Sequence, residues 1–469
     1  MSELDELKRK FPKKRDEPMP VGKRQDIIDE QREKLENKIA SGEIQLPKIN
    51  KGEIPADEVA TYLNRVGSYV TIRESKEGDV LWYNDGTGIY EAYGDKHIAE
   101  FTEAYLERLG MASNATTNYV NQVIGHIQRK TFISKDELNA NMDIMVVKNG
   151  VIKLATRELL PFDKKYKSTI AIPVNYDTNA VCPQIDKFIS EVVEPNDTAI
   201  LYEMPAWCLI RDSEIQRLVL LLGNGQDGKS KYISLLKAFL GAVNCSSYTL
   251  QQLTNNQFAA AGLDGKLANL VADLPSRALY DVGIIKTMTG GDSSQVERKY
   301  AHSFDMFNRA KLICVANTPP QVPEDSRAFW RRLIVIEFPF LFEGDKRDPY
   351  ILDKVTKPEE LSGLLNKALI LIPKLKLKSD LSYRKTIEDT RNTYNLKSDP
   401  ARSFIEECCE STVWNMPIKK EAVYQAFLKY CERKGITPIG KKKLGHVIKS
   451  ERYQEDRDCW MGMVLKDVE

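Results

Sequence analysis

The sequence is poor in the residues that build metal and redox centres. Its 469 residues include only 4 histidines and 8 cysteines. No two cysteines form a CxxC pair, and no histidine is spaced to join a cluster of cysteines or carboxylates. A zinc ribbon and a thiol redox motif are therefore excluded, and we expect a reduced, intracellular, cytoplasmic protein without a structural metal.

The chain also lacks an excess of one charge and a long apolar run. Its 68 Lys and Arg residues nearly balance 67 Asp and Glu residues, so any nucleic-acid surface must be a local patch. The longest apolar runs, such as residues 218–222, fall far short of the roughly 20 residues that span a bilayer. The first ten residues alternate in charge and do not read as a signal peptide. We expect no membrane association.

The remaining composition, 42% hydrophobic and 29% charged, supports several domains with cores of their own. Residues 1–50 are charged and proline-containing, which predicts a flexible leader. Helical spacing at Ile98, Phe101 and Tyr105 and the turn pair Asn149-Gly150 predict an α+β domain over 51–192. Alternating strands and helices predict a parallel α/β domain over 193–375, then a helical connector over 376–398 and a small domain over 399–469.

The most informative motif is a GxxxxGKS pattern between the apolar run 218–222 and a helical pattern that ends at Gly241. Glycines let the backbone wrap a phosphate, and the helix that follows directs its positive end at the same anion. The lysine can reach the β- and γ-phosphates, and the serine hydroxyl can bind Mg²⁺. The pattern predicts a nucleotide site built from Gly223, Asn224, Gly225, Gln226, Asp227, Gly228, Lys229 and Ser230.

Two more apolar runs end in polar residues of the kind that a nucleotide site needs. The run 267–272 ends at Asp273, which could hold Mg²⁺ or could simply cap a helix. The run 312–316 ends at Asn317, which could orient the attacking water or could form the turn before Thr318-Pro319. For Asn317, the residues alone do not decide between these two roles.

Basic residues at two further places allow a functional and a structural interpretation. Arg331 and Arg332 precede an apolar strand and could complete the ATP site of a neighbouring subunit, or could lie along the core surface. Residues 286–302 suggest a hairpin with a basic crest at Arg298, Lys299 and His302, which could contact phosphates or could be a solvated turn.

These motifs, in this order, resemble those of superfamily 3 helicases, and more closely the phage/plasmid and poxvirus-type primase-helicase branch. The resemblance covers roughly residues 141–469 and rests on GNGQDGKS, LANLVAD, IIKTMTGGD…VERKYAH, LICVANTPP and FWRRLIVIEF. It implies a P-loop AAA+-like ATPase core, with Lys229 and Ser230 as phosphate and Mg²⁺ ligands and Asp273 as the metal-associated acid. It further implies that Asn317 is a polar sensor and that Arg332, or else Arg331, is an arginine finger.

The same resemblance assigns DNA contacts to the hairpin and to the last domain. Arg298, Lys299 and His302 would grip single-stranded DNA in the central channel of a ring. Residues 399–469 resemble a winged helix, with a helix over 419–434, a second and basic helix over 440–449, and a wing hairpin over 452–465. The basic helix carries Lys441, Lys442 and Lys443 and could bind duplex DNA, or its charges could be a solvated face. The chain departs from many relatives at Leu274-Pro275, where a second acid is usual, and shows no Asp-x-Asp pair of a primase.

We therefore expect an ATP- and Mg²⁺-dependent homo-hexameric DNA helicase for the replication of a virus, phage or plasmid. It would move along single-stranded DNA and could work with a separate primase or polymerase. An alternative is an ATP-switched initiator that binds duplex origin DNA and recruits another helicase. A DNA-packaging motor is a weaker alternative, because the clustered acids of its nuclease are not found.

Overall fold

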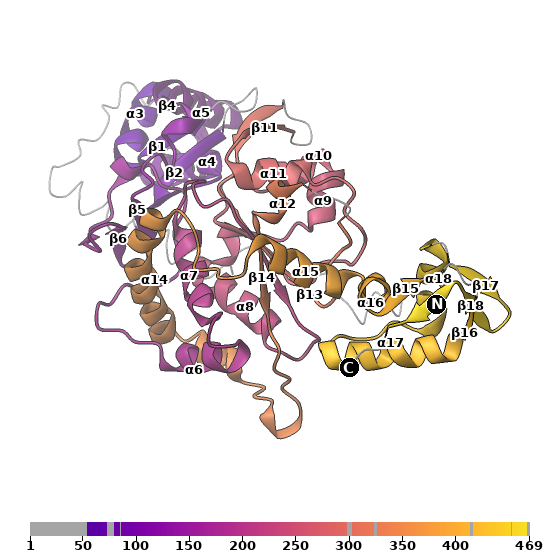
Figure 1. Cartoon of the computed structure of the whole chain (residues 1–469). Helices are drawn as coiled ribbons and strands as arrows, with labels where there is room; N and C mark the ends of the chain where they lie inside the picture. Colours follow the sequence, from indigo (N-terminus) through magenta and orange to yellow (C-terminus); the bar gives the residue numbers. More distant parts are fainter. Residues whose placement is uncertain are drawn as a thin grey trace, which may run out of the picture. The chain divides into compact units, whose positions relative to one another are not determined.

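The computed structural model of the chain describes residues 54–72, 79–84, 86–297, 303–322, 326–412, 416–451 and 453–466 (Figure 1). The described residues form two compact units. The first contains the residues up to Tyr83 and Glu91–Lys135, and the second contains Asn84–Tyr90 and the chain from Asp136 onward. Within these ranges no helix combines the length and the apolar character needed to cross a membrane.

The first unit packs three helices with the strands β2, β1 and β4, of which β1 is the middle one, and β3 falls mostly in the short segment that belongs to the second unit. Helix α4 confirms the helix predicted from Ile98, Phe101 and Tyr105, and Ile98 is fully buried in the core of the unit. The elements are α3 (Ala56–Gly67), β1 (Tyr69–Ile72), β2 (Asp79–Asn84), β3 (Ile89–Glu91), α4 (Gly94–Arg108), η1 (Ala112–Asn114), α5 (Thr117–Lys130) and β4 (Phe132–Ile133).

The second unit is organised around a parallel sheet of strand order β14-β8-β13-β10-β9. The four apolar runs at 218–222, 267–272, 312–316 and 333–338 are all strands, as predicted. These strands are apolar along their length because both faces of the sheet are covered, so neither face contacts solvent. The strands are β8 (Leu218–Leu222), β9 (Cys245–Ser246), β10 (Ala268–Val271), β13 (Lys311–Ala316) and β14 (Leu333–Glu337).

Alternate residues along each central strand enter different cores, as the two-residue period of a strand requires. Val219 and Leu221 of β8 join one core, and Leu218, Leu220 and Leu222 join the other. The first core is completed by α6 (Pro183–Val192), α7 (Thr198–Leu209), α8 (Lys229–Leu240) and α14 (Pro358–Lys378). The second is completed by α9 (Leu250–Asn255), α10 (Gln257–Ala261), α11 (Gly283–Gly290) and α12 (Arg327–Trp330).

The segment before the central sheet belongs to the same unit, which differs from the predicted boundary between residues 192 and 193. Met145, Ile152 and Phe188 lie in one continuous core with Leu221, and the chain divides near Lys135 instead. The hairpin predicted at Asn149-Gly150 is confirmed, because β5 and β6 pair antiparallel across it. This segment contains η2 (Lys135–Glu137), β5 (Ile144–Val147), β6 (Gly150–Lys153), β7 (Leu159–Leu160), η3 (Lys164–Tyr166) and α6.

The region after the sheet is helical and ends in a small group of elements with a core cluster of its own. The helices predicted near 419–434 and 440–449 are confirmed as α17 and α18, and strands follow them as predicted. The elements are η5 (Gly344–Lys346), α13 (Ile351–Val355), α15 (Ile387–Ser398), α16 (Pro400–Cys408), β15 (Cys409–Ser411), β16 (Pro417–Lys419), α17 (Lys420–Lys434), α18 (Lys441–Ser450), β17 (Gln454–Asp456), β18 (Cys459–Met461) and β19 (Met463–Leu465).

Candidate functional site

The loop that joins β8 to α8 is shaped by glycines that have no room for a side chain. Gly228 has φ +93°, and a Cβ atom on it would lie 2.6 Å from a Val192 methyl carbon of α6. A Cβ atom on Gly223 would lie 2.8 Å from the carbonyl oxygen of Phe338, just after β14. The loop is therefore held between the end of the neighbouring strand and α6, and α8 begins directly after it at Lys229.

The lysine of the loop is buried and paired with a carboxylate from the same loop. The Lys229 ammonium contacts Asp227 Oδ2, and that oxygen also accepts the Gly225 N–H at 3.0 Å. Burial lowers the pKa of Lys229, although the hydrogen bond and the charge of Asp227 act in the opposite direction. Ser230, in the first turn of α8, is exposed.

The two other polar residues predicted for the site follow neighbouring strands at the same edge of the sheet. Asn317 comes directly after β13, whose Ala316 pairs with Leu222 of β8. Asp273 comes two residues after β10, whose Val271 pairs with Cys314 of β13. Both side chains are exposed. Since all these strands are parallel, their carboxyl ends bring Asp273 and Asn317 to the edge that carries the loop.

A third polar group at this edge was missed from the sequence. Glu337 ends β14 and pairs in register with Leu222, the last residue before the loop. Its carboxylate binds Lys397 at 2.9 Å and Lys385 at 3.2 Å. Burial would raise the pKa of Glu337, but the hydrogen bonds and charges of the two lysines outweigh burial and lower it. Lys397 comes from α15, about 60 residues along the chain, and no local pattern marks it.

A cavity of about 590 Å³ adjoins the loop on the side of α6. Its wall beyond the loop is formed by the chain after β14, which runs along the loop through a hydrogen bond from the Phe342 N–H to the Gln226 carbonyl at 2.9 Å. Its lining contains both apolar and charged side chains. It is lined by Gln184, Lys187, Phe188, Glu191, Val192, Gln226, Asp227, Gly228, Ser230, Lys231, Phe342, Lys346, Arg347, Asp348, Pro349, Ile351 and Lys354.

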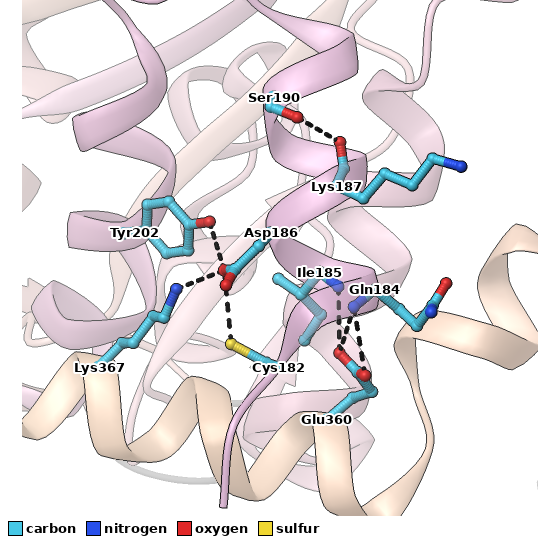
Figure 2. A network of polar contacts seen from close by, with 9 residues as sticks. All are labelled: Cys182, Gln184, Ile185, Asp186, Lys187, Ser190, Tyr202, Glu360 and Lys367. Carbon is cyan, nitrogen blue, oxygen red and sulfur yellow. Dashed lines mark hydrogen bonds and ion pairs between the residues drawn. The ribbon is translucent and has the colours of Figure 1, made fainter.

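Helix α6, one wall of this cavity, is anchored to α14 (Figure 2). The buried Glu360 carboxylate of α14 accepts the N–H groups of Gln184 and Ile185 at 3.1 Å each, which satisfies free donors at the start of α6. Asp186 then accepts the Tyr202 hydroxyl at 2.6 Å and contacts the Lys367 ammonium of α14. The wall of the cavity that α6 forms is therefore held in place by residues far apart in the sequence.

The two arginines predicted for the site lie at the opposite edge of the sheet. They precede β14, and the pairing of Leu333 with Leu218 places Arg332 beside Arg217. Six residues of extended chain, about 20 Å, separate that position from Gly223. Arg332 is buried and donates to the Ala328 carbonyl at 2.6 Å, whereas Arg331 is exposed. Neither arginine reaches the loop of its own chain.

The residues predicted to contact DNA are described in part. Strands β11 (Ser293–Val296) and β12 (Phe304–Phe307) form the predicted hairpin, but its crest with Arg298, Lys299 and His302 lies outside the described residues. Lys441, Lys442 and Lys443 form the first turn of α18 and are exposed. Lys441 binds Glu421 at 2.5 Å.

The strands next to α18 carry more acid than base. Glu455 of β17 contacts Lys420 and Lys449, and hydrogen bonds from these lysines lower the pKa of Glu455 to about 2. Asp456 and Asp458 flank Arg457 in the turn between β17 and β18. The β17–β18 hairpin therefore does not extend the positive surface formed by the three lysines of α18.

Two parts of the chain match known families. Residues 69–194 match a family described as "D5 N terminal like", and residues 221–332 match a family of unknown function, DUF5906. The second match begins just before the loop and ends at Arg332, so it contains every residue predicted for the ATP site.

Two curated relatives with helicase names come from viruses. A protein provisionally named helicase L207/L206 of Acanthamoeba polyphaga mimivirus is 28% identical over 138 residues, which is 28% of this chain and 14% of that protein. A protein provisionally named helicase 184R of Invertebrate iridescent virus 6 is 22% identical over 232 residues, 45% of this chain and 24% of that protein. The chain spans less than a quarter of the length of either relative.

Among solved structures, the apo structure of the NrS-1 C-terminal region matches with a TM-score of 0.48 and 11% identity, over 88% of this chain and 100% of that one. The family and sequence matches confirm the predicted resemblance to superfamily 3 helicases of the phage and viral primase-helicase type.

The α6 anchor predicts a specific loss of stability. Glu360→Ala leaves the N–H groups of Gln184 and Ile185 without an acceptor, which should lower the free energy of unfolding by about 2 kcal/mol. Urea denaturation would measure it, with Glu359→Ala, at an exposed position of the same helix, as the control. Equal unfolding midpoints for the two variants would show that α6 does not depend on this contact.

Proposed function

Because the chain resembles the superfamily 3 primase-helicases of phages and viruses, we propose that it is an ATP-dependent DNA helicase acting in replication. One observation carries the proposal. A GxxxxGKS loop leaves the carboxyl end of a parallel strand, enters a helix, and is flanked at the same sheet edge by Asp273 and Asn317. That combination of parts is what phosphoryl transfer from a nucleotide requires.

In this proposal the loop and the N-terminus of α8 bind the phosphates, and Lys229 reaches the β- and γ-phosphates. The Ser230 hydroxyl and the Asp273 carboxylate fit Mg²⁺, which prefers one or two protein oxygens together with phosphate oxygens. Both side chains are exposed at the loop edge, and the described residues contain no cluster of His, Cys, Asp and Glu that could hold a metal without phosphate. Asn317 would orient the attacking water.

The strand order supports an AAA+-like core, because the acid strand β10 is separated from the loop strand β8 by the strand that ends in Asn317. The cavity beside α6 would hold the base and ribose of the nucleotide. It is continuous with Gln226–Lys231, and Phe188, Val192 and Ile351 offer apolar surface for a base.

The position of the arginines supports a ring in which each ATP site is shared by two subunits. An arginine about 20 Å from its own loop can contact only the nucleotide of another subunit. We assign this role to Arg332, with Arg331 as the alternative, since Arg331 is exposed and Arg332 would have to leave the Ala328 carbonyl. A homo-hexamer would place six such sites around a central channel.

DNA would be contacted at two places. The crest of the β11–β12 hairpin, with Arg298, Lys299 and His302, would hold the single strand in the channel. The last region would act as a winged helix that binds duplex DNA through Lys442 and Lys443 of α18. Its β17–β18 hairpin is acidic and does not suit a phosphate contact. A separate primase or polymerase would complete the replication reaction.

The exposed lysines of α18 also favour a second candidate function, an ATP-switched initiator that binds duplex origin DNA and recruits another helicase. Strand displacement separates the two proposals, because an initiator of this kind hydrolyses ATP without unwinding.

The loop assignment predicts that Lys229→Ala abolishes both ATP hydrolysis and unwinding while the fold is retained. The measurement is ATP-dependent displacement from duplexes with a single 3′ or 5′ tail, with Lys237→Ala, at an exposed position in the last turn of α8, as the control. Displacement from one tail polarity only, lost in the variant, is expected. Hydrolysis without displacement from either substrate would favour the initiator, and hydrolysis by Lys229→Ala would reject the site.

The shared site predicts complementation between variants. Arg332→Ala should reduce ATP turnover by about 10³-fold or more and leave ADP binding unchanged. Mixing it with Lys229→Ala should restore part of the turnover, because an intact loop then meets an intact arginine. If Arg331→Ala shows this behaviour and Arg332→Ala does not, the assignment moves to Arg331. Absence of complementation for both would reject a shared site.

The α18 surface predicts a salt-dependent contact with duplex DNA. Lys442→Ala with Lys443→Ala should weaken binding of a non-specific duplex and lower the slope of log K against log salt by about 2. Fluorescence anisotropy measures both quantities. Lys148→Ala with Lys374→Ala removes two exposed charges outside this group of elements and is the control. Equal slopes for the two double variants would exclude α18 from the duplex site.

A further inference from the structure

Asp227 places a carboxylate inside the loop that is expected to bind phosphate. The side chain is only 6% exposed, although it belongs to a loop between two elements. Its Oδ2 atom accepts the Gly225 N–H at 3.0 Å, and its Oδ1 atom accepts the Lys229 N–H at 3.4 Å. The ammonium of Lys229, whose side chain is 3% exposed, completes the contacts.

These contacts involve groups that a nucleotide needs. A phosphate in such a loop is bound by backbone N–H groups and by the lysine ammonium. Here the ammonium and the Lys229 N–H are already engaged by a negatively charged group of the protein. A P-loop pattern requires no acid at this position, so the carboxylate is a property of this chain.

From this geometry we propose that Asp227 is an internal competitor of the nucleotide, which holds Lys229 in the empty loop and lowers the affinity for the phosphates. The inference rests on the proposed function, since it concerns the same ATP site. Two charges of the same sign a few ångströms apart repel strongly in a partly buried site. A di- or triphosphate must therefore take Lys229 from Asp227 or bind beside an uncompensated carboxylate.

The contact between Asp227 and Lys229 also stabilises the loop when no nucleotide is bound. A buried ammonium without a partner is strongly unfavourable, and Asp227 neutralises it when no phosphate is present. Loss of the carboxylate should then have opposite effects on the two states. The empty loop becomes less stable, and the nucleotide-bound loop becomes more stable relative to it.

The test is ADP binding by Asp227→Asn, measured by isothermal titration with Mg²⁺ present. Asparagine keeps an oxygen that can accept the Gly225 N–H and removes the charge. We expect ADP to bind on the order of tenfold more tightly than to the unmodified protein. AMP should gain little, because the lysine reaches the β- and γ-phosphates.

Asp353→Asn is the matched control. Asp353 is an exposed acid of α13 that neither lines the cavity nor belongs to the loop. Its ADP affinity should stay within about twofold of the unmodified protein. A similar gain in this variant would show that the net charge of the protein, and not Asp227, sets the affinity, and would overturn the proposal.

The remaining outcomes are equally decisive. Unchanged or weaker ADP binding by folded Asp227→Asn would overturn the competitor role and leave the ATP site intact. Absence of ADP binding by both the unmodified protein and the variant would overturn the proposed function itself. If Asp227→Asn does not fold without nucleotide, Asp227→Ser replaces it, and the expected gain is the same.

Discussion

The structure depends on the burial of β8 between two parallel neighbours and two helical layers. Hydrogen bonds to β13 and β14 and the alternating burial of Leu218–Leu222 leave this strand a single register. The loop that follows β8 is therefore fixed at the carboxyl end of this strand. Because every strand of the sheet runs in the same direction, the residues that follow β8, β10, β13 and β14 collect at one edge, and the proposed phosphate and Mg²⁺ ligands lie there.

The second constraint is the close approach of backbone to backbone around the loop. Gly228 packs on Val192, and Gly223 packs on the chain after β14, so neither position tolerates a Cβ atom. Helix α6 is in turn held by Glu360 of α14. The loop, the cavity and α14 therefore form one rigid arrangement within the unit. Asp227 and Lys229 sit at its centre, where a change of charge acts on both the empty and the nucleotide-bound state.

Much of the fold was predictable because its signals are local. Hydrophobic periodicity and turn residues predict the strands, the Gly-rich loop, the Asn149-Gly150 hairpin and the helix at Lys420–Lys434. The structure contains each of them. The domain boundary at residue 192 was not predictable in this way. A boundary is set by which apolar faces pack together, and the face of α6 packs on α13 and α14, which come later in the chain.

The sequence by itself determined which residues are candidates for the ATP site: the loop 223–230, Asp273, Asn317 and the arginine pair each follow or precede a strand that its apolar run reveals. Only the tertiary structure decided how these residues meet. It turned Asp227 inward onto Lys229, brought Glu337 and Lys397 to the loop edge, and placed Arg332 about 20 Å away at the far edge. The reason is physical, because strand order and side-chain direction follow from packing between segments far apart in the chain, which no local pattern records.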